Sequence, residues 1–278
     1  MTDTSPPLAG VVGWPIAHSR SPVLHNYWLK RYDLAGYYIP IPLKPQDFEA
    51  GIRMLPRLGF RGVNLTIPYK EMILPLADAV SDRASLIGAA NTITFLADGA
   101  IHADNTDGVG FLSSVQASEP DWSAKNGPAL ILGAGGAARA VISALLNAGA
   151  PEVRIANRTR QKAEMLAEHF GGRAMAVDWA TAGDTADGAM TIVNTTALGM
   201  QGKPPLTISL DAAPAGATVV DIVYNPLDTD FLLRARERKL RTVDGLGMLL
   251  YQAVPGFESW FGHRPEVDDT LRQVVLEA

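Results

Sequence analysis

Residues 129–149 read ALILGAGGAARAVISALLNAG, and this stretch decides the fold. A short apolar strand, 129–132, runs directly into a glycine-rich turn, and an alanine-rich helix follows. The spacing of Gly133, Gly135 and Ala138 fits the G-x-G-x-x-G/A pattern of a βα turn that binds a dinucleotide. Gly133 permits the tight turn, and Gly135 lets the backbone approach a pyrophosphate. The pyrophosphate would accept hydrogen bonds from the free N–H groups at the helix N-terminus.

A glycine pattern alone also suits a tight strand-to-helix turn that binds nothing. A second strand at 153–156 favours the nucleotide-binding interpretation, because it completes a βαβ unit around the helix. We therefore expect the turn to contact the cofactor through Gly133, Ala134, Gly135, Gly136 and Ala137.

The residues after the second strand indicate which dinucleotide binds. In NAD-binding units an acidic residue about 20 residues beyond the glycines binds the ribose 2′-hydroxyl. This chain has no carboxylate there; it has Asn157, Arg158 and Thr159, followed by Arg160 and Lys162. Such donors and cations suit a 2′-phosphate, since each charge-assisted hydrogen bond contributes about 1.5–3 kcal/mol. The sequence predicts NADP; the alternative is an ordinary solvated helix N-terminus.

The composition is typical of a globular enzyme. Of the 278 residues, 47% are hydrophobic and 19% charged, and the formal net charge of −5 argues against a nucleic-acid partner. The absence of cysteine excludes disulfides and thiolate chemistry, and the five histidines lack metal-ligand spacing, so we expect no metal. We expect neither a signal peptide nor a membrane span, and we predict a cytoplasmic location with no membrane partner.

Two serines follow the first predicted strand, 8–13. Ser21 precedes Pro22, an order that predicts a helix with Ser21 as its N-cap. The cap alone explains Ser21, whereas Ser19 has no such structural role. Two hydroxyl groups beside a helix N-terminus suit a small carboxylate ligand.

More polar side chains follow at the ends of later strands. A strand at 37–43 and a helix at 45–55 precede a strand in which Asn64 and Thr66 share one face, since side chains alternate along a strand. Lys70 opens the next helix, where the helix dipole disfavours a cation. A lysine at this unfavourable position is a mild indication of a functional role, and the common alternative is an ordinary solvated lysine.

A hairpin with its turn at 97–99 connects Asn91 to Asp107. Asp107 alone also suits the N-cap of a helix at 109–116. Open α/β sheets bind ligands at the carboxyl ends of their strands. The serines, Asn64, Lys70 and the hairpin residues therefore predict one binding cleft.

Beyond residue 160, helices and strands alternate, which predicts a parallel sheet with right-handed crossovers. Thr195 lies at the exit of a strand at 191–195, and we expect it at the cofactor. A helix that starts near residue 248 should be broken into two pieces at Pro255. Further strands are expected at 218–223 and 241–243, and further helices at 162–170, 231–239 and after residue 265.

The chain resembles the shikimate dehydrogenase family in motifs that occur in the right order along nearly its whole length. These motifs are H-S-R-S-P at 18–22, N-x-T-x-P-x-K at 64–70, G-A-A-N-T at 88–92, D-N-T-D-G at 104–108, G-A-G-G-A at 133–137, N-R-T at 157–159 and D-G-L-G-M-L at 244–249. The resemblance implies an enzyme that reversibly reduces 3-dehydroshikimate to shikimate with NADPH, in chorismate and aromatic amino-acid biosynthesis.

The resemblance also implies an α/β fold of two domains. A discontinuous substrate-binding domain, 1–107 plus 245–278, would have a mainly parallel sheet, and 108–244 would form a Rossmann-type NADP domain. The expected partner is a small-molecule substrate, and the protein should be a monomer or a homodimer.

The family's site residues carry over to matching positions of this sequence. Lys70 and Asp107 match the catalytic pair. The substrate carboxylate would be held by Ser19, Ser21 and Tyr224, and the ring hydroxyls by Asn64, Asn91 and Gln252, with Thr66 beside them. Positions that line the cofactor are Asp82, Ile222 and Gly245. One departure is Lys162, where the family has Arg, which puts the margin of NADP preference in doubt.

Three alternatives stay open. The first is a quinate/shikimate dehydrogenase that uses NAD, against which the Asn157–Thr159 cluster argues. The second is an NADP-binding sensor without catalysis, which Lys70 and Asp107 disfavour. The third is a reductase such as a methylenetetrahydrofolate dehydrogenase, whose folate suits the paired serines and the Asn64 set less well than a small polyhydroxy acid does.

Overall fold

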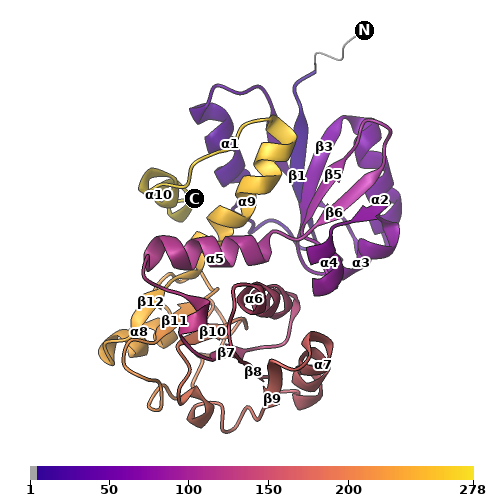
Figure 1. Cartoon of the computed structure of the whole chain (residues 1–278). Coiled ribbons are helices and arrows are strands. Elements are labelled where there is room, and N and C mark those ends of the chain that lie inside the picture. The colour runs from indigo at the N-terminus through magenta and orange to yellow at the C-terminus, as the bar shows by residue number, and fades with distance from the viewer. Residues whose placement is uncertain (1–4) are drawn as a thin grey trace. The chain divides into compact units, whose positions relative to one another are not determined.

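The computed structural model describes residues 5–278, which divide into two compact units. One unit runs to residue 106 and resumes at 249–278, and the other comprises 107–248. The sequence predicts boundaries after residue 107 and before residue 245. The observed divisions fall after 106 and after 248, the second of them inside a helix. Each unit contains its own six-stranded sheet (Figure 1).

The sheet of the first unit is mixed, with three parallel and two antiparallel strand pairs. Its spatial order is β2 (Tyr37–Pro42), β1 (Leu8–Gly13), β3 (Phe60–Leu65), β5 (Thr92–Phe95), β6 (Ile101–Asp104) and β4 (Ala79–Val80). The helices of this unit are α1 (Ser21–Arg31), α2 (Phe48–Met54), α3 (Tyr69–Met72), α4 (Asp82–Ile87), most of α9 (Gly245–Phe261) and α10 (Asp269–Leu276).

Helices cover both faces of this sheet because side chains alternate along its strands. Ala9 and Val11 of β1 pack with Trp260 of α9, whereas Val12 points to the other face and packs with Phe48 of α2. Figure 1 shows α1 and α9 on one side of the sheet and α2 on the other. The carboxyl ends of β1 and β3 are thereby left for the polar residues that follow them.

The sheet of the second unit is entirely parallel. Its order is β12 (Arg241–Val243), β11 (Thr218–Asp221), β10 (Thr191–Asn194), β7 (Ala129–Leu132), β8 (Val153–Ala156) and β9 (Ala174–Val177). Counted along the chain from β7, this is the order 3-2-1-4-5-6 of a dinucleotide-binding Rossmann fold, read from the β9 edge. The helices are α5 (Asp107–Ser118), α6 (Gly136–Asn147), α7 (Arg160–Phe170) and α8 (Asp230–Glu237).

Both faces of the parallel sheet are buried, as its apolar strands require. All four residues of β7 are buried, with Ile131 packing against Phe111 of α5 and Val141 of α6. Leu130 points to the opposite face, where it joins Phe231 of α8. The α/β fold with two mainly parallel sheets confirms the predicted fold class.

The predicted break at Pro255 is wrong, because α9 is a single helix with Pro255 inside it. Residues beyond the proline are held by the sheet: Phe257 and Trp260 are buried, and the Trp260 indole donates to the carbonyl oxygen of Ile93 at 3.0 Å. Packing against β5 therefore outweighs the hydrogen bond that proline removes.

Three smaller predictions also need correction. The segment predicted as a helix at 45–55 is a 3₁₀ turn, Pro45–Asp47, followed by α2 and a second 3₁₀ turn. Asp107 is the first residue of α5 rather than a cap before residue 109. β3 ends at Leu65, so Thr66 lies just beyond the strand. Within residues 5–278 no helix has the length and apolar character needed to cross a membrane.

Candidate active site

Ser19 and Ser21 lie where the chain leaves β1 and enters α1. The N-cap position is Arg20, and no side chain caps the helix, so the prediction that Ser21 caps α1 is wrong. Ser19 Oγ instead accepts a hydrogen bond from the backbone N–H of Ser21 at 3.4 Å. Ser21 is buried, and its hydroxyl lies near the phenol of Tyr38, whose pKa it lowers.

Asn64, on β3, is buried and hydrogen-bonded at both ends of its amide. Its Oδ1 accepts from the Tyr38 hydroxyl at 2.7 Å. Its Nδ2 donates to the backbone oxygen of Asn91 at 3.1 Å and to Thr92 Oγ1 at 3.3 Å. Burial raises the pKa of Tyr38 well above its usual value, although the Ser21 hydrogen bond opposes the shift, so the phenol keeps its proton.

Asn91 continues this network toward α9. Its Oδ1 accepts from the Thr106 backbone N–H at 2.8 Å and from Thr92 Oγ1 at 3.0 Å. Its Nδ2 donates to Gln252 Oε1 at 3.2 Å, and Gln252 Nε2 donates to the Leu249 carbonyl at 3.0 Å. The fold thus connects three predicted substrate residues through side-chain or backbone hydrogen bonds: Asn64, Asn91 and Gln252.

Lys70 and Thr66 are tied to the same region by their backbone. Lys70 is half-buried in α3, and its carbonyl accepts from the Ala90 N–H at 2.7 Å, next to Asn91 in the chain. The Thr66 N–H donates to the Val12 carbonyl at 3.1 Å. Asp107, buried at the start of α5, and the half-buried Tyr224 belong to the second unit.

The glycine turn of the second unit leaves an open helix N-terminus. Gly133 has φ +118°, and a Cβ there would lie 2.6 Å from Thr195 Oγ1, so only glycine fits. Thr195 donates its hydroxyl to the Leu132 carbonyl at 2.8 Å. Gly135 is the N-cap of α6, without a side-chain cap, and a Cβ on Gly135 or Gly136 would meet no described atom within 4 Å. The start of α6 therefore combines open space beside two glycines with the lack of a side-chain cap among the described residues.

Cations lie at the exit of β8, the strand beside the glycine turn. Asn157 Nδ2 donates to the Thr159 carbonyl at 2.8 Å, and Thr159 is the N-cap of α7. Arg160 is bound by carboxylates, Glu164 at 2.8 Å and Asp178 at 3.6 Å. Arg158 and Lys162 are exposed and form no ion pair with any residue of 5–278. The two unpaired cations suit an anionic ligand, whereas Arg160 is already neutralised.

The other predicted cofactor residues, Gly245, Ile222 and Asp82, lie outside the glycine turn and the segment after β8. Gly245 approaches the exit of β11 so closely that a Cβ would lie 2.3 Å from the Ile222 carbonyl oxygen. Asp82 is exposed and begins α4 in the first unit. Near Ile222, the pKa of the buried Asp221 is raised to about 6 by burial, in spite of hydrogen bonds that include one from Thr229 at 2.8 Å.

Tyr38 and His25 are residues of this site region that the sequence analysis does not single out. Tyr38 appears in the sequence only as one of two adjacent tyrosines in an edge strand, and alternation shows that they face opposite ways without showing which faces inward. His25 is fully buried, and neither ring nitrogen has a hydrogen-bond partner. Burial lowers the pKa of His25 to about 3, so its ring is neutral.

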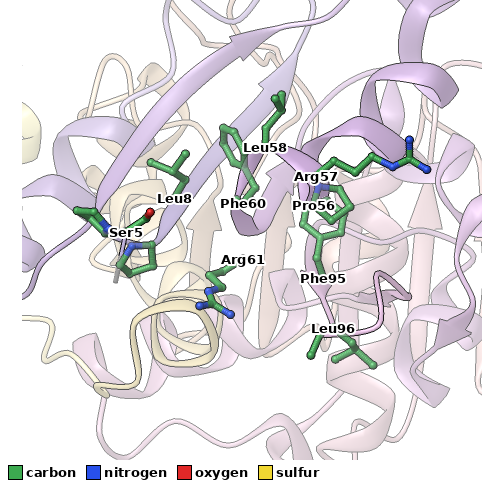
Figure 2. A pocket seen from close by; sticks show the side chains of 13 residues that line it. Ser5, Leu8, Pro56, Arg57, Leu58, Phe60, Arg61, Phe95 and Leu96 are labelled. Carbon is green, nitrogen blue, oxygen red and sulfur yellow. The ribbon is translucent and has the colours of Figure 1, made fainter. Parts of the chain in front are cut away.

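No predicted site residue lines the hollow of about 530 Å³ shown in Figure 2. It lies at the amino ends of β1 and β3, where Leu8 and Phe60 contribute to its wall with Arg61. The polar network lies at the opposite, carboxyl ends. Within residues 5–278 no group of three or more His, Asp or Glu side chains could hold a metal ion.

Three family models match this chain in succession. Residues 11–93 match the shikimate dehydrogenase substrate binding domain, 116–197 match shikimate / quinate 5-dehydrogenase, and 245–275 match the shikimate 5′-dehydrogenase C-terminal domain. The first and third ranges flank the second, as the first unit flanks the second unit in the chain.

Relatives and solved structures agree with these matches. The shikimate dehydrogenase (NADP(+)) of Paracoccus denitrificans is 57% identical over 281 residues, covering 99% of this chain and 100% of the relative. The structure of shikimate 5-dehydrogenase from Thermus thermophilus in complex with NADP(H) and shikimate has a TM-score of 0.87 at 37% identity, covering 97% and 98% of the two chains. Quinate dehydrogenase from Corynebacterium glutamicum in complex with NAD has a TM-score of 0.91 at 31% identity, covering 99% and 100%.

Proposed function

Because the chain belongs to the shikimate dehydrogenase family, we propose that Lys70 and Asp107 supply the acid–base chemistry with which it interconverts 3-dehydroshikimate and shikimate. The chain is an NADP-dependent oxidoreductase of that family. The observation that carries the activity is the 57% identity, along 99% of the chain, to a relative that bears the name of this reaction.

The first unit would bind the substrate. Ser19 and Ser21, with Tyr224 from the second unit, would hold the carboxylate through hydroxyl donors. Asn64, Asn91 and Gln252 would bind the ring hydroxyls, and Thr66 would lie beside them. The buried hydrogen bonds that join Asn64, Asn91 and Gln252 support this assignment, because a rigid polar surface can match a pattern of hydroxyl groups.

The second unit suits NADP in two respects. The uncapped N-terminus of α6, with open space at Gly135 and Gly136, suits a pyrophosphate. The exposed Arg158 and Lys162 suit a 2′-phosphate, with Asn157 and Thr159 as further donors. The other residues proposed to line the cofactor are Gly133, Ala134, Ala137, Thr195, Ile222, Gly245 and Asp82.

The proposed mechanism places proton transfer on Lys70. NADP(H), held by the residues of the second unit, would supply or accept the hydride at ring carbon C3. As the C3 oxygen gains charge during reduction, the Lys70 ammonium group donates a proton to it, and in the reverse direction the amine accepts that proton. Asp107 would orient Lys70 and bind the same hydroxyl. A positioned acid–base group of this kind accelerates a reaction by about 10²- to 10⁴-fold.

The test is an initial-rate measurement at the nicotinamide absorbance, with shikimate or quinate combined in turn with NADP⁺ or NAD⁺. We expect turnover of shikimate with NADP⁺ to dominate. No turnover in any combination, with NADP⁺ still binding, would contradict the catalytic proposal and support the sensor alternative.

A second candidate is a quinate/shikimate dehydrogenase that uses NAD. It is favoured by the similarity to the quinate dehydrogenase from Corynebacterium glutamicum, whose structure contains NAD. The unpaired cations Arg158 and Lys162 after β8, in the place of a carboxylate, argue against it. Comparable turnover of quinate with NAD⁺ in the same experiment would support this candidate.

A further inference from the structure

The phenol of Tyr38 lies between two of the proposed substrate-binding side chains. Its hydroxyl donates to Asn64 Oδ1 at 2.7 Å, and the Ser21 hydroxyl is close enough to oppose the rise in the pKa of the phenol. An amide oxygen only accepts, so the single phenolic proton is donated to Asn64. The phenol is thus the donor in its contact with Asn64, and the amide oxygen is the acceptor.

This direction determines what Asn64 can offer a ligand. Both hydrogens of its Nδ2 are used, one by the Asn91 backbone oxygen and one by Thr92 Oγ1. One of the two lone pairs of Oδ1 is used by Tyr38. The remaining lone pair of Oδ1 can only accept a hydrogen bond. Toward the substrate, Asn64 is thus an acceptor for a hydroxyl that donates.

The backbone and the ring of Tyr38 are also held in place, by Asn26 and His25. Its N–H donates to Asn26 Oδ1 at 3.1 Å, and its carbonyl accepts from Asn26 Nδ2 at 2.8 Å. The ring is stacked on the His25 imidazole with a centroid separation of 3.9 Å and an interplanar angle of 1°. His25 forms no hydrogen bond through its nitrogens and is packed edge-on against Trp28, with its ring centroid 5.8 Å from that of Phe257. The imidazole therefore acts as a flat neutral support for the phenol ring.

We propose that Tyr38 is a positioning residue for the dehydrogenase reaction: it fixes the Asn64 amide so that its oxygen recognises a hydroxyl donor on the substrate ring. The proposal rests on the proposed function, because it takes Asn64 and Ser21 as substrate-binding residues. Without the phenolic proton, Asn64 Oδ1 loses its hydrogen bond from Tyr38, while Nδ2 keeps its bonds to Asn91 and Thr92. The amide oxygen is then held less firmly in the position from which it accepts a hydrogen bond from the substrate hydroxyl.

The test is the Tyr38→Phe variant, which keeps the ring and removes the hydroxyl. We expect the KM for shikimate to rise about tenfold, the effect of losing roughly one well-placed hydrogen bond. The kcat should change less, and the KM for NADP⁺ should stay unchanged. In an Asn64→Ala background, Tyr38→Phe should raise the KM for shikimate no further, because its effect passes through Asn64.

Tyr32→Phe is the matched control, since Tyr32 is in the same unit and its hydroxyl accepts from the Glu266 N–H at 3.0 Å. It should leave the KM for shikimate unchanged. A Tyr38→Phe variant with a lowered melting temperature and a wild-type KM for shikimate would overturn the positioning role, as would additive effects with Asn64→Ala. A wild-type enzyme that turns over no shikimate would overturn the proposed function as well, so the two failures are distinct.

Discussion

Lys70 is held beside Asn91 by its own backbone rather than by the helix in which it lies. Its carbonyl accepts a hydrogen bond from the Ala90 N–H at 2.7 Å, and α3 has four residues only. A helix this short has little dipole of its own, and a cation in its first turn gains nothing from it. The position of Lys70 is therefore fixed by this backbone hydrogen bond rather than by local helix stability.

Replacing Lys70 with Ala should reduce kcat by about 10²-fold or more and leave the KM for shikimate nearly unchanged, because a proton donor acts mainly in the transition state. Steady-state kinetics with saturating NADP⁺ measure both constants. Ser19→Ala is the comparison variant, for which the KM for shikimate should rise through loss of a carboxylate contact. A raised KM with an unchanged kcat in Lys70→Ala would show that Lys70 is a binding residue.

His25 should make the folding stability pH-dependent. Burial lowers its folded pKa to about 3 from an ordinary value of 6.5, so the unfolded chain binds a proton that the folded chain does not. The free energy of unfolding is therefore reduced as the pH falls below 6.5, by up to about 1.4 kcal/mol per pH unit. His25→Phe removes this contribution while keeping a flat ring on Tyr38.

The measurement is urea unfolding of both proteins at pH 7.5, 6 and 5. Between pH 7.5 and 5 the wild type should lose about 2 kcal/mol relative to His25→Phe. Asp221, whose pKa is raised to about 6, acts in the opposite direction: the folded form keeps a proton that the unfolded form releases. That contribution is common to both proteins and cancels in the difference. Parallel pH profiles would show that the pKa of His25 is the same in the folded and unfolded protein, contrary to this prediction.

The role of a residue was predictable from the sequence where a local motif determines it. It was not predictable where contacts with residues distant in the sequence determine it. The local sequence indicates that Gly133 must turn tightly, and its φ of +118° confirms this. Ser21 looks like an N-cap because Pro22 follows it, yet it does not cap the helix, and its hydroxyl lies near the phenol of Tyr38, 17 positions later in the sequence. No local pattern reveals that partner, because it depends on the pairing of β1 with β2.

At the scale of elements, α1 is stabilised by the segment that leads into α10. The Trp28 indole donates to the Glu266 carbonyl at 3.0 Å, and Arg31 forms an ion pair with Asp268 at 2.6 Å. Asp268 is also the N-cap of α10, accepting from the Leu271 N–H at 2.9 Å. That backbone hydrogen bond, with the Arg31 contact, lowers the pKa of Asp268, although partial burial opposes the shift.

Asp268→Ala should therefore destabilise the protein by about 1 kcal/mol, the usual effect of losing a helix cap. Asp268→Asn is the matched variant: it keeps a side-chain oxygen for the cap and loses only the charge. It should cost less, because an exposed ion pair contributes little. Thermal unfolding of the three proteins gives the order of stability. Equal losses in both variants would mean that the ion pair, rather than the cap, is the stabilising contact.

Elements were predictable where hydrophobic periodicity was strong, as for β7 and α6, and less so where a helix depends on its neighbours. Pro255 predicts a break, since proline removes a backbone hydrogen bond. The helix continues because the residues beyond Pro255 pack against the sheet, which includes the Trp260 contact with Ile93. The rule that proline breaks a helix considers one residue only and takes no account of the packing of the residues that follow it.

At the scale of the whole molecule, the chain forms its first unit from two segments, to residue 106 and from 249 onward. Composition and periodicity contain no sign of this discontinuity; it was predictable only from the family resemblance. Gln252 illustrates the consequence, because it bonds to Asn91 across 161 positions of sequence. A substrate site of this kind requires both segments to fold as one unit.

Most of the proposed contacts with each ligand belong to one unit, which predicts two separate patterns of hydrogen exchange. A ligand that binds only the folded form stabilises it by about 2.7 kcal/mol at a concentration 100 times its Kd. Amides near the ligand should exchange correspondingly more slowly. NADP⁺ should protect 133–140 and 157–163, whereas shikimate should protect 19–25 and 64–70. Peptides at 48–54, in α2, contain none of the proposed contacts and serve as the internal control.

Mass spectrometry of the full chain with each ligand alone would measure both patterns. Protection of the glycine turn by shikimate alone, or of the Ser19–Ser21 segment by NADP⁺ alone, would contradict the assignment of ligands to units. Equal protection of α2 would indicate global stabilisation instead of local contact. The expected separation follows from the chemistry of each unit: one has an open helix N-terminus with unpaired cations, and the other has a buried network of amides and hydroxyls.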